Sequence, residues 1–175
     1  HNVNFLNQEG SGAVLRGFTL AGDGGNRGVY VYNFATPVLQ DLVIYNKQRA
    51  INCGYNSDIT ISNVTLAGND YGVYLENRAD VTLTNSIIWS SNYSPIYLGD
   101  TGSEISVAYS DIQGGEVNIG GSGSVTWGTG NITGNPLFVD ANSDDYHLQS
   151  TSPCIDAGDP DADGDGENYT TDTDD

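Results

Sequence analysis

The chain has 175 residues, with 23 acidic against five basic side chains and a formal net charge of −18. This balance argues against binding to nucleic acid or to an anionic membrane surface, because both need clustered Lys and Arg. No apolar run approaches the roughly 20 residues that span a bilayer, so we expect no membrane insertion. The many Gly, Asn, Ser and Thr residues are typical of turn-rich β structure. Together with the scarcity of Lys, they indicate a secreted or cell-surface protein.

Short runs that alternate apolar and polar residues recur about every 22 residues along most of the chain. Stacked on this repeat, they fall into three columns. The first column holds Val29-Tyr30-Val31, Ile51-Asn52-Cys53, Val73-Tyr74-Leu75, Ile96-Tyr97-Leu98 and Val117-Asn118-Ile119. The second column holds Ile59-Thr60-Ile61, Val81-Thr82-Leu83, Ile105-Ser106-Val107 and Val125-Thr126-Trp127. The third column holds Phe18-Thr19-Leu20, Leu42-Val43-Ile44, Val64-Thr65-Leu66, Ser86-Ile87-Ile88 and Ser110-Asp111-Ile112.

Three short strands in each repeat predict an all-β solenoid with three faces, in which each strand bonds to the same strand of the next coil. Hairpins are disfavoured because turn dipeptides such as Asn-Gly are missing between the columns. The period-2 alternation directs the outer residues of each triplet into the core and the middle residue outward. We therefore predict about six coils over residues 1–134, with Val73 and Ile51 in one buried column.

The segment at residues 135–158 breaks the repeat. A solenoid must protect its open end, because exposed strand edges invite aggregation. We therefore predict that residues 135–158 form an irregular C-terminal cap, followed by an acidic loop and tail at residues 159–175. The N-terminal end shows no comparable cap, so we expect it to be covered by preceding chain or by another subunit.

Several motifs carry a resemblance to a known family. These are "VNFLNQEGSGAVLRGFTLAG", the Asn-ended coils "DLVIYN", "NVTLAGN" and "NSIIWSSN", and the C-terminal segment "NPLFVD…DYHLQSTSPCIDAGDP". The chain resembles the secreted right-handed parallel β-helix proteins of the pectin-lyase-like superfamily. Its C-terminal segment is similar to the C-terminal end of large bacterial surface proteins. The resemblance implies a right-handed parallel β-helix. It does not fix an activity, because the superfamily includes polysaccharide lyases, hydrolases, epimerases, adhesins and passive spacers.

A column of tyrosines is the first candidate site. Tyr30, Tyr74 and Tyr97 occupy the outward position of the first column, with Asn52 and Asn118 in the same column. Exposed aromatic rings in a row favour contact with sugar rings, so these three tyrosines are the predicted carbohydrate-binding residues. The alternative is that Tyr stands there because it favours strands and shields the sheet.

Three carboxylates at the start of second-column strands form another candidate site. Asp58, Asp80 and Glu104 each lie one residue before a strand of the second column. Stacked about 4.8 Å apart, they should raise one another's pKa or recruit a cation. Paired carboxyl groups also perform glycoside hydrolysis when they lie roughly 5 to 9.5 Å apart. The competing explanation is that corner Asp residues cap turns.

Arg27 and Arg49 form a small basic corner beside the first column. The family resemblance implies a catalytic possibility, since lyases of the superfamily use a basic residue, often Arg, to remove a proton from an acidic sugar. The simpler interpretation is that these arginines pair with Asp70 or Glu76 on neighbouring coils. A further polar set, Asp41, Asn63 and Asn85, is expected to form a structural ladder at a corner or inside the solenoid.

The segment "DADGDGENYTTD", residues 161–172, has the spacing of a calcium loop. Acidic residues at positions 1, 3, 5 and 12 converge as the chain curls around the ion, and Gly166 makes the sharp turn. The predicted ligands of Ca²⁺ are Asp161, Asp163, Asp165, Glu167 and Asp172. No helix pattern follows, so the loop is not a complete EF-hand. The alternative is a disordered acidic tail.

The two cysteines are predicted to be buried free thiols. Cys53 aligns with core residues of the third coil, whereas Cys154 lies beyond the sixth coil. At about 4.8 Å per coil they lie farther apart than the roughly 7 Å between Cα atoms that a disulfide permits.

Two functions remain open. The first is a non-catalytic extracellular element, structural, adhesive or glycan-contacting, that is stabilised by calcium and has polysaccharides or other surface proteins as partners. Its solenoid ends would also allow head-to-tail self-association. The second is a polysaccharide lyase, hydrolase or epimerase acting on acidic glycans. The lack of long inserted loops and the net charge of −18 favour the first.

Overall fold

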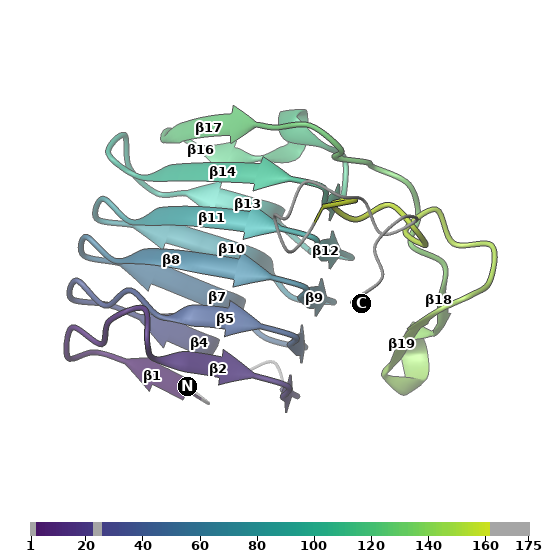
Figure 1. The fold of residues 1–175 in the computed structure, drawn as a ribbon, viewed down its shortest axis with the longest axis horizontal. Helices are drawn as coiled ribbons and strands as arrows, with labels where there is room; N and C mark the ends of the chain where they lie inside the picture. Colours follow the sequence, from purple (N-terminus) through teal and green to yellow (C-terminus); the bar gives the residue numbers. More distant parts are fainter. Residues whose placement is uncertain (1–2, 23–25, 162–175) are drawn as a thin grey trace.

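The chain winds into a parallel β-solenoid (Figure 1), as the repeat predicts. The computed structural model describes residues 3–22 and 26–161. Within them, two six-stranded sheets and one five-stranded sheet form the three faces, and every pairing within these sheets is parallel. No helix in this part of the chain is long and apolar enough to cross a membrane.

Each of the first five coils contributes one strand to each face, and the sixth contributes a strand to the first and second sheets. In the second to fifth coils the strands follow the predicted columns. The first sheet consists of β1 (Val3–Phe5), β4 (Arg27–Val31), β7 (Arg49–Gly54), β10 (Tyr71–Glu76), β13 (Ser94–Leu98) and β16 (Gly120–Gly121). The second sheet consists of β2 (Val14–Arg16), β5 (Val38–Gln40), β8 (Asp58–Ser62), β11 (Asp80–Thr84), β14 (Glu104–Ala108) and β17 (Ser124–Trp127). The third sheet consists of β3 (Thr19–Leu20), β6 (Val43–Tyr45), β9 (Thr65–Ala67), β12 (Ile87–Trp89) and β15 (Asp111–Ile112).

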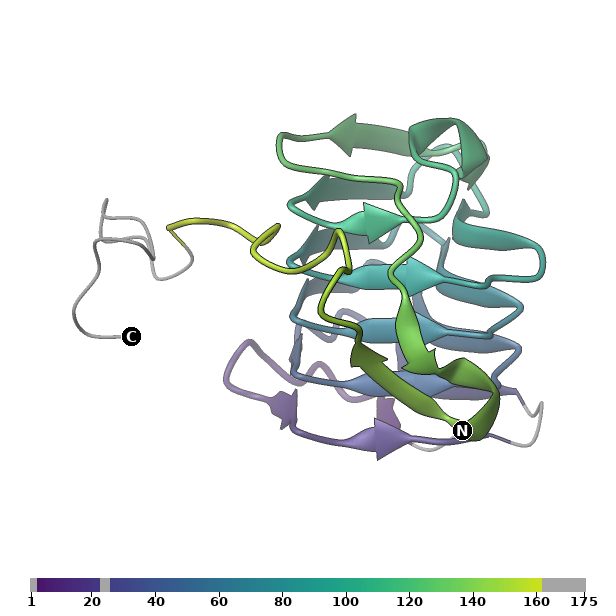
Figure 2. The ribbon, with the colours of Figure 1, turned by 90° about the vertical axis from the view of Figure 1, so that its right-hand side faces the viewer.

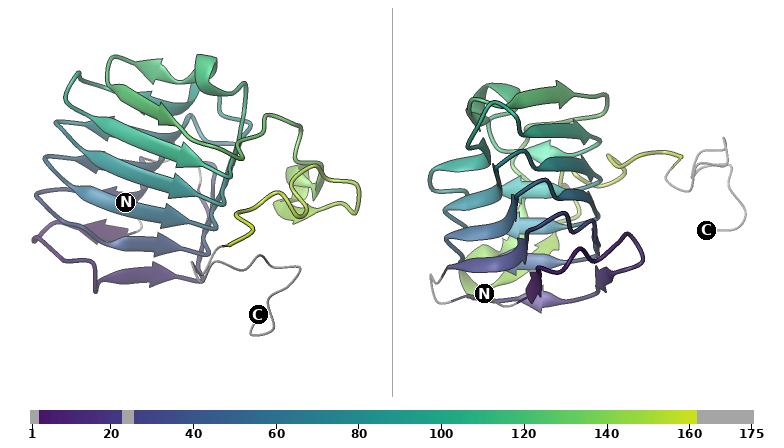
Figure 3. Two further views of the ribbon diagram at one scale, coloured as in Figure 1. Left: turned by 45° about the horizontal axis from the view of Figure 1, so that its top comes forward. Right: turned by 90° about the vertical axis from the view of Figure 1, so that its left-hand side faces the viewer.

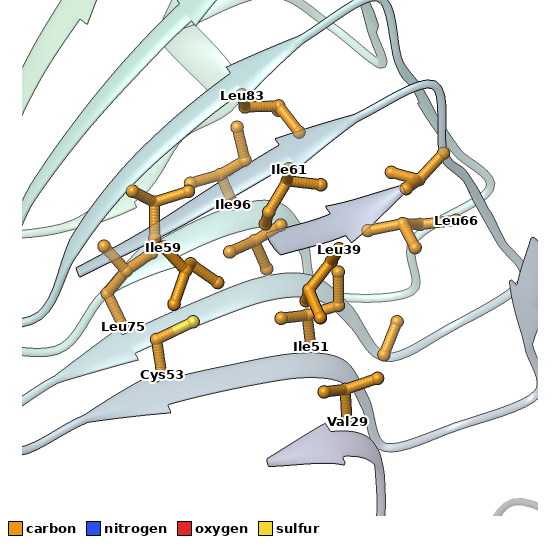
Figure 4. Packing of buried hydrophobic residues seen from close by; sticks show 14 of the residues in the cluster. Val29, Leu39, Ile51, Cys53, Ile59, Ile61, Leu66, Leu75, Leu83 and Ile96 are labelled. Atoms are coloured by element: carbon orange, nitrogen blue, oxygen red, sulfur yellow. The ribbon is translucent and has the colours of Figure 1, made fainter. Parts of the chain in front are cut away.

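The core is a set of aliphatic columns that run along the solenoid axis. Val73 pairs in register with Ile51 on one side and with Ile96 on the other, and all three side chains are fully buried. Leu83 of the second sheet and Leu66 of the third point into the same interior (Figure 4). Each such side chain contributes about 1.5–3 kcal/mol by leaving water, so the coils are held together chiefly by their stacked interiors.

One corner of every coil turns through a left-handed residue. Between the second and third sheets, φ is 54° at Asp41 and Asn63, 51° at Asn85 and 48° at Tyr109. Asn and Asp tolerate this conformation better than other non-glycine residues, which explains their recurrence here. The predicted polar set is therefore confirmed as a corner column. Among the described residues, its side chains do not bond along the column; Asp41 Oδ2, for example, accepts a hydrogen bond from Arg16 Nε at 2.6 Å.

The sixth coil departs from the predicted repeat. The prediction that residues 117–119 form a first-sheet strand is wrong: a 3-10 helix, η1 (Glu116–Asn118), occupies this stretch, and Val117 is 96% exposed. The first sheet ends instead with Tyr97 paired to Gly120 and Leu98 paired to Gly121. Gly121 has a φ of 101°, and a Cβ there would lie 1.9 Å from the carbonyl oxygen of Leu98, so only glycine fits this contact.

Residues 135–161, which we call the C-terminal strap, run along the flank of the solenoid (Figures 1 and 2). The prediction placed residues 135–158 over the open end, but their contacts lie on the third sheet. The strap contains β18 (Phe138–Asp140), a 3-10 helix η2 (Ala141–Ser143) and β19 (Asp145–Leu148), and β18 and β19 pair antiparallel.

Two outward apolar residues of the third sheet, Val43 and Ile87, lie under the strap. They alternate with Thr19 and Thr65 in the outward column of that sheet. The outward column of the second sheet carries Val14 and Val38 in the first two coils and Thr60, Thr82 and Ser106 in the next three. Covering Val43 and Ile87 removes their apolar side chains from water. The last coil, meanwhile, is closed in part by its own Trp127, which packs against the core (Figure 3 shows this end of the solenoid).

Candidate functional site

The predicted tyrosine column exists on the first sheet. Tyr74 of β10 pairs in register with Tyr97 of β13 and with Asn52 of β7, and Asn52 pairs with Tyr30 of β4. The strand alternation directs all four outward, because their neighbours along each strand are core residues. Asn118 does not belong to this column, because Gly120 takes the position next to Tyr97.

Further aromatic residues extend the column into two clusters. The upper cluster consists of Tyr71, Tyr74, Tyr93 and Tyr97, with neighbouring ring centroids 5.1–5.6 Å apart. The lower cluster consists of Tyr30, Tyr32, Phe34 and Tyr55, with neighbouring centroids 5.2–5.7 Å apart. Such contacts stabilise the pairs by about 0.5–1.5 kcal/mol beyond their burial. We call both clusters, with Arg27 and Arg49 between them, the tyrosine face.

The central rings of the tyrosine face do not lie flat on the sheet surface. Tyr74 and Tyr97 stack nearly parallel, with an interplanar angle of 22° and centroids 5.1 Å apart. Each of these rings therefore covers a face of the other, and both are only partly exposed. Tyr93 is 71% exposed at one end, and Phe34 and Tyr55 are 50% and 44% exposed at the other. The accessible aromatic surface thus belongs mainly to residues at the two ends.

The two arginines lie in the same face. Arg27 pairs in register with Arg49, and the guanidinium carbon of Arg49 lies 3.6 Å from the ring centroid of Tyr74. The corresponding carbon of Arg27 lies 4.6 Å from the ring centroid of Tyr30. Both distances are within the range of cation–π attraction. The tyrosine column and the basic corner, which the sequence predicts as separate features, therefore form one surface.

Asn52 joins the two guanidinium groups. Its side-chain oxygen accepts hydrogen bonds from Arg27 Nε and from Arg49 Nη1, the latter at 2.9 Å. Its amide nitrogen donates to the carbonyl oxygen of Tyr74 at 3.2 Å and to Glu76 Oε1 at 3.3 Å. Asn52 occupies an outward position yet is fully buried, because the side chains on this face cover it.

The predicted ion pairing is confirmed for one acidic residue. Arg49 Nη1 lies 3.7 Å from Glu76 Oε2, whereas Asp70 accepts a hydrogen bond from Asn92. Burial raises the pKa of Tyr74 and of Tyr30, an effect that Arg49 and Arg27 partly offset. Both phenols therefore remain neutral near pH 7 and offer hydroxyl groups that can donate and accept hydrogen bonds.

The most exposed rings of this face escape prediction from the repeat. Tyr55 and Phe34 lie in left-handed corner positions, with φ of 53° and 60°. Tyr55 directly follows β7, and Phe34 lies three residues after the end of β4. Tyr93 lies one residue before β13. All three fall outside the strand triplets on which the columns are aligned. The signal that was available is a bulky aromatic residue at a turn, where small polar residues are usual.

The carboxylate column is also confirmed in register. Asp80 pairs with Asp58 on one side and with Glu104 on the other, at the exposed start of the second-sheet strands. Partial burial, with Glu104 and Asp58 adding to it, raises the pKa of the Asp80 carboxyl. In the described residues, 3–22 and 26–161, no three His, Cys, Asp or Glu side chains are grouped closely enough to hold a metal ion.

The predicted calcium loop lies almost entirely outside the described residues. Only Asp161 is described, and its backbone N–H donates to Asp159 Oδ1 at 3.2 Å. Asp163, Asp165, Glu167 and Asp172 are not described.

Both cysteines are free thiols, as predicted. Cys53 is fully buried in the core, where burial raises its pKa. Cys154 is only partly buried: it lies in the strap, and its Sγ donates to Asp111 Oδ2 of β15 at 3.1 Å. Next to this contact, a cavity of about 360 Å³ separates the strap from the third sheet.

Comparison with known proteins identifies the family. The model of the right-handed β-helix region matches residues 2–151, so the chain belongs to this family. This match covers the coils and most of the strap, and it agrees with the three parallel sheets. No curated protein and no solved structure matches the chain.

Proposed function

We propose that the tyrosine face binds a glycan, and that the protein is a non-catalytic, extracellular β-helix of the pectin-lyase-like superfamily. The observation that carries this proposal is the surface itself: two aromatic clusters, separated by two guanidinium groups, extend across neighbouring strands of one sheet. Aromatic rings favour the apolar faces of sugars, while guanidinium and phenol groups bond to hydroxyl and carboxylate oxygens.

The ring geometry defines how a sugar chain would lie. Because Tyr74 and Tyr97 stack on each other, they would contact a glycan by their edges and hydroxyl groups. The exposed faces available for stacking belong to Tyr93 at one end and to Tyr55 at the other. A polysaccharide that crosses several coils would reach both ends, whereas a monosaccharide would reach only one.

Binding to immobilised polysaccharides tests this proposal. We expect the double variant Tyr93→Ala/Tyr55→Ala to lose affinity by about ten-fold or more, since each ring truncation at a contact centre costs more than about 1 kcal/mol. Phe18→Ala is the matched control, because Phe18 is an aromatic residue, 56% exposed, beside the third sheet. Failure of the wild-type protein to bind any polysaccharide in the panel, or equal losses in both variants, would contradict the proposal.

The contacts of Arg49 support a binding role over a catalytic one. Its guanidinium bonds to Asn52, lies near Glu76 and stacks on Tyr74. A guanidinium offers hydrogen-bond donors and no acceptor, which suits contact with hydroxyl and carboxylate oxygens, whereas a general base must accept a proton. Incubation with uronic-acid polymers and Ca²⁺, followed by the absorbance of unsaturated products, is the direct assay. Turnover that Arg49→Ala abolishes would establish a lyase and overturn the non-catalytic proposal.

We also propose calcium binding at residues 161–172 and self-association through the solenoid ends. The spacing of the acidic residues supports the first. For the second, the support is that β1 and β16 are the outermost strands of the first sheet, so each has one edge to which no strand in the described part of the chain is paired. Electron microscopy of the purified protein would reveal filaments, and a uniformly monomeric preparation at high concentration would contradict head-to-tail stacking.

A further inference from the structure

The contact between the strap and the third sheet contains a buried carboxyl group, that of Asp111, of which only one oxygen is hydrogen-bonded to a described residue. Asp111 stands at an outward position of β15, in register with Ile87, and is only 3% exposed because the strap covers it. Its Oδ2 accepts from Cys154 Sγ at 3.1 Å. Its Oδ1 is buried and has no hydrogen-bond partner among the described residues. An ionised carboxylate is costly at such a position, because burial takes it out of bulk water.

The other titratable groups around Asp111 do not relieve this cost. Those lining the adjoining cavity are Tyr109, at the corner before β15, and Cys154 and Asp159 of the strap. Burial raises the pKa of the Cys154 thiol to about 12, so it stays neutral. Asp159 carries an acidic side chain, and no Lys, Arg or His lines the cavity in the described part of the chain. The groups facing Asp111 are therefore neutral or acidic.

Few polar contacts hold the strap near this point. The backbone N–H of Asp159 donates to Asn85 Oδ1 at 2.8 Å, and Cys154 bonds to Asp111. Farther along, the ring of Tyr146 lies 5.2 Å from that of Tyr45. A change in the charge of Asp111 therefore acts directly on one of the strap's main attachments.

We propose that the C-terminal strap is a pH-sensitive latch, which docks tightly on the third sheet when Asp111 carries a proton and loosens when Asp111 loses it. A protonated Asp111 is a neutral acid and can remain buried under the strap. An ionised Asp111 gains hydration only if the strap lifts. Release would uncover the outward side chains of Val43 and Ile87 on the third sheet.

The direction and size of the pH effect follow from the pKa of the Asp111 carboxyl when the strap is docked. Burial raises its pKa from the ordinary 3.8 to about 6, although the Cys154 hydrogen bond opposes the rise. Because the docked pKa is raised, the docking free energy is most favourable below about pH 4 and weakens as the pH rises through about 6. The docking equilibrium should weaken about a hundred-fold between pH 3 and pH 8.

Hydrogen exchange measured by mass spectrometry tests the latch. After correction for intrinsic rates, amides of residues 145–161 should be more protected at pH 4.5 than at pH 8, while amides of β8 and β11 should report an intact solenoid at both. Asp111→Asn, a neutral isostere, should abolish the pH dependence in the strap. Asp58→Asn removes one exposed carboxylate and should preserve it. Equal protection of the wild-type strap at both pH values, or persistence of the pH dependence in Asp111→Asn, would overturn the proposal.

Discussion

Arg49 lies over the ring of Tyr74, with its guanidinium carbon 3.6 Å from the ring centroid, although the two residues belong to neighbouring coils. The contact therefore joins one coil to the next across the outer surface, where ion pairs alone are weak. Its geometry also fixes the orientation of the Tyr74 ring, which in turn stacks on Tyr97. The arrangement of the tyrosine face thus depends on the polar residues beneath it.

Asn52 is the first residue through which this dependence can be tested. Asn52→Ala removes the oxygen that accepts from Arg27 and Arg49, so we expect the free energy of unfolding to fall by about 1–3 kcal/mol. Urea denaturation measures this change. Glycan affinity should fall as well, since two neighbouring guanidinium groups would repel each other without their shared acceptor. Unchanged stability would show that the arginines find other partners.

Gly72 tests the tight packing between coils. A Cβ at this position would lie 2.5 Å from the carbonyl oxygen of Pro95 and 2.4 Å from Ile88 Cγ2. Gly72→Ala should therefore destabilise the protein by about 1–3 kcal/mol. Gly12→Ala is the matched control, because nothing lies within 4 Å of the position that a Cβ would take there, and its effect should stay within about 0.5 kcal/mol. Equal melting temperatures for the two variants would refute this account.

Asp80 tests the carboxylate column. Its pKa is raised in the folded protein by partial burial and by Glu104 and Asp58, so its ionisation opposes folding as the pH rises through that pKa. Asp80→Asn should stabilise the protein by about 0.2–1 kcal/mol near pH 7, and the gain should vanish near pH 3. Glu116→Gln, on η1, removes the same charge away from the column. A similar gain from Glu116→Gln would attribute the effect to net charge alone.

Calcium binding has its own measurement. At a calcium concentration 100 times the Kd, a bound ion stabilises the folded state by about 2.7 kcal/mol, so chelation should lower the Tm by several degrees. Adding Ca²⁺ again should restore it. The double variant Asp163→Asn/Asp165→Asn should respond to neither treatment. A variant that responds like the wild-type protein would place the ion elsewhere.

The regular part of the fold could be predicted because the same interaction recurs in each coil. Alternating triplets such as Val73-Tyr74-Leu75 place side chains inward and outward without reference to distant residues, and the observed register of Val73 with Ile51 follows from that pattern. The sixth coil could not be predicted in this way. Its strand is set by glycines at the close approach to Leu98, and the apolar Val117 mimics a triplet while remaining exposed.

The candidate site was predictable only in part, because its arrangement depends on contacts across the columns. Tyr30, Tyr74 and Tyr97 follow from the repeat, but their stacking and the burial of Asn52 depend on where the arginine side chains fold back. The strap was misplaced for a related reason. Its docking surface includes Val43 and Ile87, two outward apolar side chains of the third sheet. The second sheet also carries an outward valine, Val38, in the second coil, so the strand triplets alone do not distinguish the covered sheet from the exposed one.

The strap also limits how many coils the solenoid can have between its attachment points. It leaves the sixth coil, reaches Tyr45 of the second coil and returns to Asn85 and Asp111 of the fourth and fifth. Solenoids usually tolerate gain or loss of whole repeats, since each coil contacts only its neighbours. Here a duplicated coil between Tyr45 and Asn85 would move these attachment points apart by about 4.8 Å, while the strap kept its length. Repeat number in this stretch is therefore constrained by a segment that belongs to none of the repeats.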